Sequence, residues 1–84
     1  MTFTLLIRAY CHLCDDMRTA LQPLVSRLGV ELVEIDVDAH PELEQRYGDL
    51  VPVLLAGDVD TGRELCHYHL DHGAVRCALN ASGG

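Results

Sequence analysis

The chain has 84 residues, of which 49% are hydrophobic and 23% are charged, which is the composition of an ordinary globular domain. Its 13 acidic residues outnumber its 6 basic ones, and the formal net charge is −7. Nucleic acids and anionic membranes usually bind basic surfaces, so neither is an expected partner. The length predicts one domain over residues 1–84, with residues 80–84 as a frayed tail.

The first part of the chain predicts a strand, a helix and a second strand. Residues 3–8 form a nearly continuous run of apolar and β-branched residues, typical of a central strand covered on both faces. Residues 30–38 alternate apolar and acidic side chains and predict a strand nearer an edge. Between them lies an amphipathic helix that ends at Gly29, and Pro23 should kink or split it. Its apolar residues are Leu13, Met17, Leu21, Leu24 and Leu28.

The second half of the chain predicts a helix, a β-hairpin and a final helix. Pro41 suits the first position of a helix, and Gly48 suits its end. Residues 50–57 and 63–68 predict two strands joined by a short turn. Asp71 can cap a last helix. The predicted order is β-α-β-α-β-β-α, and the first two strands should be parallel because a helix joins them.

The sequence YCHLCDD follows the first predicted strand and contains a C-x-x-C pair. Such a pair at the start of a βαβ unit is typical of a thiol redox motif. Cys11 would lie at the N-terminus of the helix, where backbone N–H groups and the helix dipole favour a nucleophilic thiolate. Cys14, one turn further on, could then resolve a mixed disulfide on Cys11. Asp15 and Asp16 oppose a nearby thiolate, whereas a protonated His12 would favour it.

Three features resemble the glutaredoxin-like branch of the thioredoxin fold. They are CHLC at 11–14, HPELEQRYGDLVP at 40–52, and the order of elements at the length of a minimal glutaredoxin. The resemblance implies an α/β fold with a four-stranded mixed sheet in the order 2-1-3-4 and helices on both faces. It also implies a cis Val51–Pro52 peptide bond facing the cysteines, and thiol–disulfide exchange as the activity.

The same resemblance implies no bound cofactor and makes glutathione a candidate co-substrate. By position, Arg8 would hold a glutathione carboxylate, the backbone of Val51 would pair with the cysteinyl unit, and Arg46 is a weaker carboxylate candidate. The other candidate substrate-binding residues are His12, Leu13, Pro52 and Asp71.

The sequence also departs from the glutaredoxin pattern. His12-Leu13 replaces the usual Pro-Tyr between the cysteines, and CHYHLD replaces the usual Gly-Gly turn before the last helix. A disulfide-bearing protein or another small thiol is therefore the alternative substrate.

Two other classes of function remain open. The segment CHYHLDH, with Cys77, contains residue types that bind zinc or copper. On a strand, His67 and His69 would share one face while Cys66 points to the other, and no second C-x-x-C completes a tetrahedral site, so we assign no metal ligands. A docking module with the same fold and no catalytic role is the other alternative.

The N-terminal apolar run is interrupted at Arg8, so it is too short for a signal peptide or a membrane span. We therefore expect a monomer in the cytoplasm that does not bind membranes.

Overall fold

A computed structural model describes the backbone of residues 1–83 and the side chains of residues 1–80. Within this range the chain forms four strands, three α-helices and one 3-10 turn: β1 (Thr2–Ile7), α1 (His12–Leu28), β2 (Glu31–Asp36), η1 (Val37–Ala39), α2 (Pro41–Tyr47), β3 (Val53–Ala56), β4 (Arg63–His67) and α3 (His72–Gly83). The strands form one sheet in the order β2-β1-β3-β4, as predicted. β1 and β2 are parallel, and the other two pairs are antiparallel.

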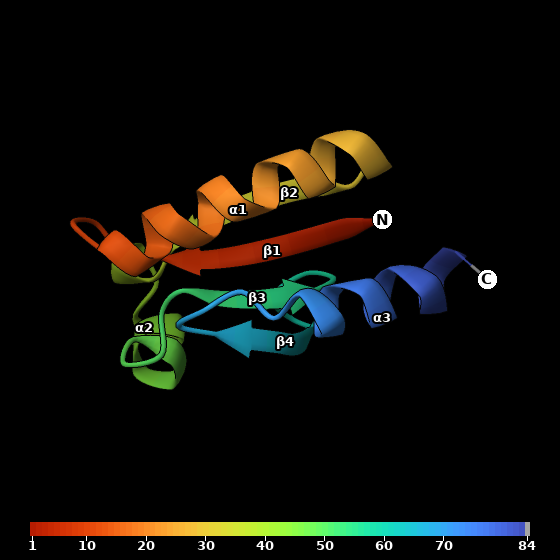
Figure 1. Cartoon of the computed structure of the whole chain (residues 1–84). Coiled ribbons are helices and arrows are strands. Elements are labelled where there is room, and N and C mark those ends of the chain that lie inside the picture. Colours follow the sequence, from red (N-terminus) through yellow and green to blue (C-terminus); the bar gives the residue numbers. More distant parts are fainter. Residues whose placement is uncertain (84) are drawn as a thin grey trace.

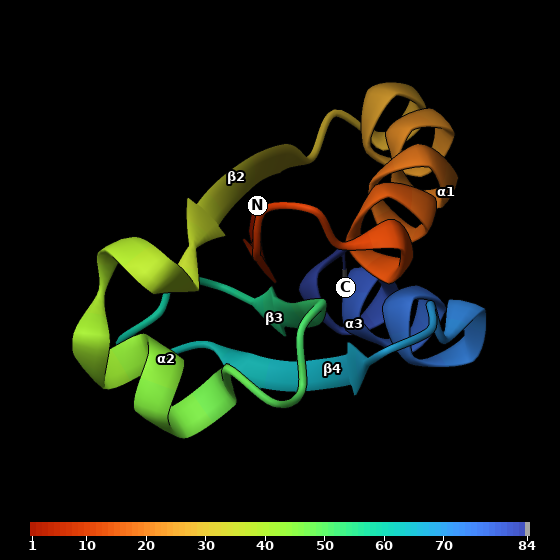
Figure 2. The same cartoon turned by 90° about the vertical axis from the view of Figure 1, so that its left-hand side faces the viewer.

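Helices cover both faces of the sheet, as predicted. Figure 2 shows α1 and α3 on one face and α2 on the other. Successive residues of a strand point to opposite faces, so the central strands supply two separate core layers. Phe3 and Leu5 of β1 pack in the layer with α1 and α3, whereas Leu6 packs in the layer with α2. This burial on both faces explains why β1 is made of apolar residues and β-branched threonines, with no charged side chain.

Pro23 was expected to kink or split the first helix, and the split is wrong. α1 runs as one helix over His12–Leu28 with Pro23 inside it (Figure 1), and Gly29 caps it in the left-handed conformation with φ 67°. A proline removes only one backbone hydrogen bond. Leu21 and Val25, on either side of Pro23, are buried in the core, so packing holds both halves of the helix in place.

Three strands are shorter than the sequence predicts. The second strand ends at Asp36, because the chain turns there into η1, with the Asp36 side chain accepting a hydrogen bond from the Asp38 N–H group. The third strand begins only at Val53, and the fourth ends at His67. Tyr68 then adopts φ 65°, which ends the extended backbone. His67 and His69 were predicted to lie on the same face of a strand. In the structure only His67 belongs to a strand, so this prediction is wrong.

The last helix extends further than predicted. α3 continues to Gly83 and so includes most of the expected tail of residues 80–84, while Gly84 lies outside the described residues. None of the helices in the described part of the chain is long and apolar enough to cross a membrane.

Candidate active site

The two cysteines of the C-x-x-C pair lie at the start of α1 and form a disulfide. Cys11 is the N-cap residue of the helix, and Cys14 lies in its first turn, with 5.2 Å between their Cα atoms. The Cys14 backbone N–H group donates a hydrogen bond to Cys11 Sγ over 3.1 Å. A sulfur at this position meets the free N–H groups and the positive end of the helix dipole, which stabilise an anion.

The two sulfur-bearing residues differ in their access to solvent. Cys14 is only 1% exposed, whereas Cys11 is half-buried. The residues on either side of Cys11 are open to solvent: the Tyr10 side chain is fully exposed, at a backbone φ of 57°, and His12 is also exposed. An external partner can therefore reach Cys11 first, while Cys14 is placed to react with what has bound to Cys11.

The segment before β3 lies beside the end of β1 that leads to the cysteines. Val53 pairs with Leu6 across the sheet, so Pro52 is next to the last residue of β1. The Val51–Pro52 peptide bond is cis, and Pro52 is fully buried. Within residues 1–83 the backbone N–H and C=O groups of Val51 make no hydrogen bond to another backbone group. This backbone can therefore pair with an extended segment of a bound molecule.

Arg8 is the residue predicted to bind a glutathione carboxylate, and in the structure its guanidinium is already paired with carboxylates of this chain. Its Nε atom lies 3.1 Å from Asp38 Oδ1, and its Nη2 atom lies 3.1 Å from Glu44 Oε1. Its Nη1 atom donates to the Gly48 carbonyl oxygen over 3.2 Å. These contacts, the hydrogen bond to Asp38 above all, raise the pKa of Arg8 above its ordinary value. Arg8 therefore joins the end of β1 to η1 and to the end of α2.

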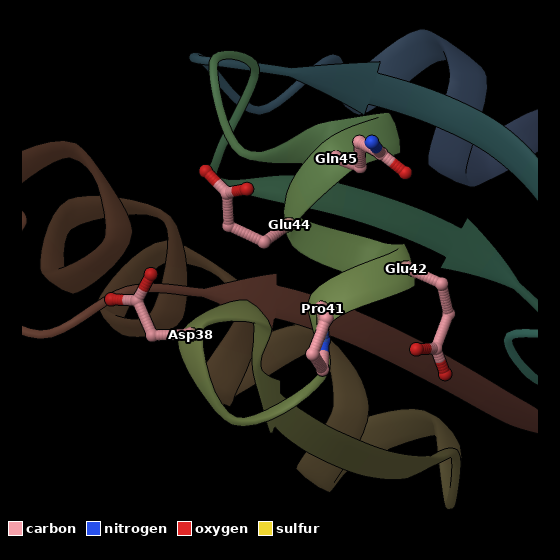
Figure 3. Close-up of a pocket in the computed structure, with 5 residues that line it drawn as sticks. All are labelled: Asp38, Pro41, Glu42, Glu44 and Gln45. Carbon is pink, nitrogen blue, oxygen red and sulfur yellow. The ribbon is translucent and has the colours of Figure 1, made fainter.

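Asp38 and Glu44 also line a shallow recess beside α2 with a cavity volume of about 630 Å³. Figure 3 shows that the two carboxylates point to the same side, whereas Glu42 points away from them. The remaining residues that line the recess, Pro41 and Gln45, carry no charge. The charged residues that line the recess are therefore all acidic.

A second ion-pair cluster lies on the first turns of α1. Arg18 Nη1 contacts Asp15 Oδ1 at 2.9 Å, and Arg18 Nε contacts Glu34 Oε1 of β2 at 2.6 Å. Asp15 is thus partly neutralised, whereas the exposed Asp16 has no ion-pair partner within the described residues. Of the two aspartates that follow Cys14, Asp16 therefore retains the less compensated charge.

The remaining predicted site residues are less directly placed. Leu13 is half-buried in the first turn of α1, between the two cysteines. Asp71 caps α3, because its Oδ1 atom accepts a hydrogen bond from the Ala74 N–H group over 3.0 Å. The Arg46 guanidinium lies 5.1 Å from the centre of the Tyr47 ring. No hydrogen bond or ion pair of the described residues joins Asp71 or Arg46 to the cysteine pair.

The other two cysteines are free thiols. Cys66 is half-buried against the core layer of α1 and α3, and this burial raises the pKa of its thiol. Cys77 is exposed on α3. Among the residues described, no group of three or more His, Cys, Asp or Glu side chains is arranged to hold a metal ion.

The sequence reasoning missed Asp38 and Glu44 as neighbours of the site. A signal for Asp38 was present, because β1 and β2 were predicted to be parallel and adjacent, and residues that follow parallel strands meet at one edge. In the structure Ile7 pairs with Asp36, so Arg8 and Asp38 leave the sheet close together.

A parallel β1–β2 pair, an antiparallel β3–β4 hairpin and a C-x-x-C disulfide at the start of α1 together define a thioredoxin-fold protein of the glutaredoxin type. Thioredoxin 1 of Thermosipho africanus shares this fold, with a TM-score of 0.66 at 16% identity over 100% of both chains. The family model described as Glutaredoxin-like domain (DUF836) matches residues 2–80, and the chain belongs to this family.

Two more similar proteins support the assignment. Protein Ne2328 of Nitrosomonas europaea, solved by NMR, is 37% identical, with a TM-score of 0.78 over 90% of this chain and 87% of that one. The uncharacterised protein Rv0508 of Mycobacterium tuberculosis is 34% identical over 83 residues, which cover 93% of this chain and 81% of that protein. Neither name states an activity. These relatives therefore support the family assignment and give no information on the reaction.

Proposed function

We propose that the protein is a thiol–disulfide oxidoreductase that uses Cys11 and Cys14 as its dithiol–disulfide pair. The observation that carries this proposal is the difference in exposure between the two sulfurs at the start of one helix. A nucleophilic thiol must be exposed enough for the substrate to reach it. A resolving thiol needs access only to the nucleophilic cysteine and can be buried. Cys11 and Cys14 meet these two requirements in that order.

The reaction proceeds in two exchanges. The Cys11 thiolate attacks one sulfur of a substrate disulfide; that S–S bond breaks, and the departing thiolate takes up a proton. Cys14 then loses its proton and attacks Cys11 Sγ in the mixed disulfide, which releases the second substrate thiol. The substrate is thereby reduced by two electrons, and the Cys11–Cys14 disulfide forms. The free N–H groups at the start of α1 stabilise the attacking thiolate, and Val51 and Pro52 shape the groove where the substrate binds.

The proposed partner is a disulfide-bearing protein or a small disulfide, met by a monomer in the cytoplasm. Two thiols of this small chain, Cys66 and Cys77, are free, which suits a reducing compartment. Glutathione is a candidate co-substrate by family resemblance alone.

The test is reversible oxidation of the Cys11–Cys14 pair in dithiothreitol redox buffers that contain a chelator. Samples are quenched with acid, alkylated and analysed by intact mass and peptide mapping. The background variant is Cys66→Ser/Cys77→Ser, so that no other thiol reacts. We expect a single midpoint and a loss of two hydrogens that maps to Cys11–Cys14.

Two variants then separate the roles of the cysteines. In the same background, Cys11→Ser should abolish reduction of a neutral disulfide, and Cys14→Ser should accumulate a mixed disulfide on Cys11. Wild-type reduction rates in the Cys11→Ser protein would overturn the assignment of the nucleophile. A protein that carries out no exchange and tolerates both substitutions in partner binding would instead be a docking module.

A further inference from the structure

The arginines on the two elements that flank the cysteine pair, β1 and α1, each form ion pairs with more than one carboxylate. Each of two arginines is matched by two carboxylates: Arg8 by Asp38 and Glu44, and Arg18 by Asp15 and Glu34. Each cluster therefore carries one surplus negative charge when its carboxylates are ionised. Asp16 adds another next to the first turn of α1. Arg46 of α2 opposes this field with a single positive charge.

The Arg8 cluster matters most for substrate choice. All three guanidinium nitrogens of Arg8 already donate, to Asp38, Glu44 and the Gly48 carbonyl oxygen. A carboxylate on a substrate would have to approach Arg8 beside Asp38 and Glu44, whose two negative charges exceed the single positive charge of the guanidinium. An ammonium group, by contrast, meets attractive charge from Asp38 and Glu44 without displacing anything. The fully exposed ring of Tyr10, the residue before Cys11, offers a further surface for a cation.

We infer that this site prefers disulfides that carry positive charge and disfavours glutathione disulfide, with Asp38 and Glu44 as the residues that determine this specificity. The inference rests on the thiol–disulfide exchange proposed above and names its substrate class. Cationic disulfides include cystamine and protein disulfides flanked by lysine or arginine. In the reaction with cystamine, Cys11 attacks one sulfur and one cysteamine leaves with a proton. Cys14 then displaces the second cysteamine, so cystamine is reduced and the protein pair is oxidised.

The test compares three disulfides of different charge on the reduced protein in the Cys66→Ser/Cys77→Ser background. They are cystamine, which is cationic, bis(2-hydroxyethyl) disulfide, which is neutral, and glutathione disulfide, which is anionic. The chain contains no tryptophan, so oxidation is followed by acid quench, alkylation and intact mass. Each rate constant is divided by the rate constant of the same disulfide with free dithiothreitol, which removes differences in intrinsic reactivity. We expect the normalised rate constant for cystamine to be about tenfold higher than that for glutathione disulfide at low salt. This ratio should decrease at high salt.

Two variants with opposite expected effects test the role of the Arg8 cluster. Asp38→Asn/Glu44→Gln frees Arg8 and should shift the ratio toward glutathione disulfide by about fivefold or more. Arg8→Gln leaves both carboxylates unopposed, so it should raise the preference for cystamine and leave the glutathione rate no higher. The matched control, Glu31→Gln/Asp60→Asn, also removes two exposed carboxylates, and neither of them contacts Arg8 or lines the recess. Its ratio should stay within about twofold of the parent. The neutral disulfide reports any general loss of folding or reactivity in each variant.

The outcomes separate this inference from the function on which it rests. If the neutral disulfide does not oxidise the protein, the proposed oxidoreductase function fails and the substrate preference fails with it. If the neutral disulfide reacts but glutathione disulfide matches or exceeds cystamine, only the preference is overturned. An Asp38→Asn/Glu44→Gln protein whose ratio stays within about twofold of the parent would also overturn it, because these two carboxylates would then not determine the preference.

Discussion

Reduction of the Cys11–Cys14 disulfide should lower the thermal stability of the fold by a measurable and limited amount. The two cysteines are separated by 3 positions, so the bond closes a very short loop. In the chain-entropy treatment a loop of this size constrains the unfolded chain by about 2 kcal/mol, near the lower end of disulfide contributions. For a domain of this length, that free energy corresponds to a fall in Tm of about 10 °C. A thiolate stabilised at the start of α1 would reduce the fall.

The assay is thermal unfolding followed by circular dichroism at neutral pH, with and without a phosphine reductant. Cys11→Ala/Cys14→Ala is the control, and its Tm should not respond to the reductant, because Cys66 and Cys77 are free thiols in both states. A reduced wild-type protein whose Tm equals or exceeds that of the oxidised one would refute the reasoning. It would mean that interactions of the reduced pair outweigh the chain constraint, as expected of a strongly oxidising site.

Two further predictions follow from groups outside the redox pair. Burial raises the pKa of Cys66, so at mildly alkaline pH it carries less thiolate than an ordinary cysteine. Iodoacetamide should therefore modify the exposed Cys77 well before Cys66. Faster labelling of Cys66 in timed peptide mapping would contradict this. In the turn before β4, hydrogen bonds from Thr61 and Asp60 lower the pKa of Asp58 below 3.8. The stabilisation from the ionised Asp58 is therefore present above pH 3.8 and lost as the pH falls through the folded pKa, so Asp58→Asn should lose less stability between about pH 6 and pH 2.5 than wild type in urea titrations. Equal losses in the two proteins would show that the turn does not depend on this charge.

The order of elements and the sheet topology could be predicted from the sequence because hydrophobic periodicity and chain connectivity constrain them strongly. The apolar run at residues 3–8 is buried on both faces, as its composition indicated, and the Gly29 cap lies where the sequence put it. The predicted split at Pro23 was wrong because it considered only the local effect of proline on helix hydrogen bonding. Buried side chains lie on both sides of the proline and hold the helix in place. Tertiary packing outweighed one missing hydrogen bond there.

The cysteine pair could also be located from sequence, because its spacing and its place after a strand are local features. The state of Arg8 could not, because the residues that determine it lie 30 and 36 positions away in the chain. The charge of a residue can be read from sequence, but whether that charge is available to a substrate depends on which partners the fold supplies. The family resemblance gave Arg8 a position and left those partners unspecified.

The Arg8 contacts connect the architecture of the site to its selectivity. Arg8 joins the end of β1 to Asp38 after β2 and to Gly48 before the Val51–Pro52 segment, so one side chain links three parts of the chain that are distant in sequence. Acceptors of this chain take hydrogen bonds from all three of its guanidinium nitrogens, and two of these acceptors are carboxylates whose negative charge opposes the approach of a substrate carboxylate. Removing Arg8 should therefore affect stability more than glutathione turnover. In a glutaredoxin-type site that recruits glutathione through this position, the order of the two effects would be reversed.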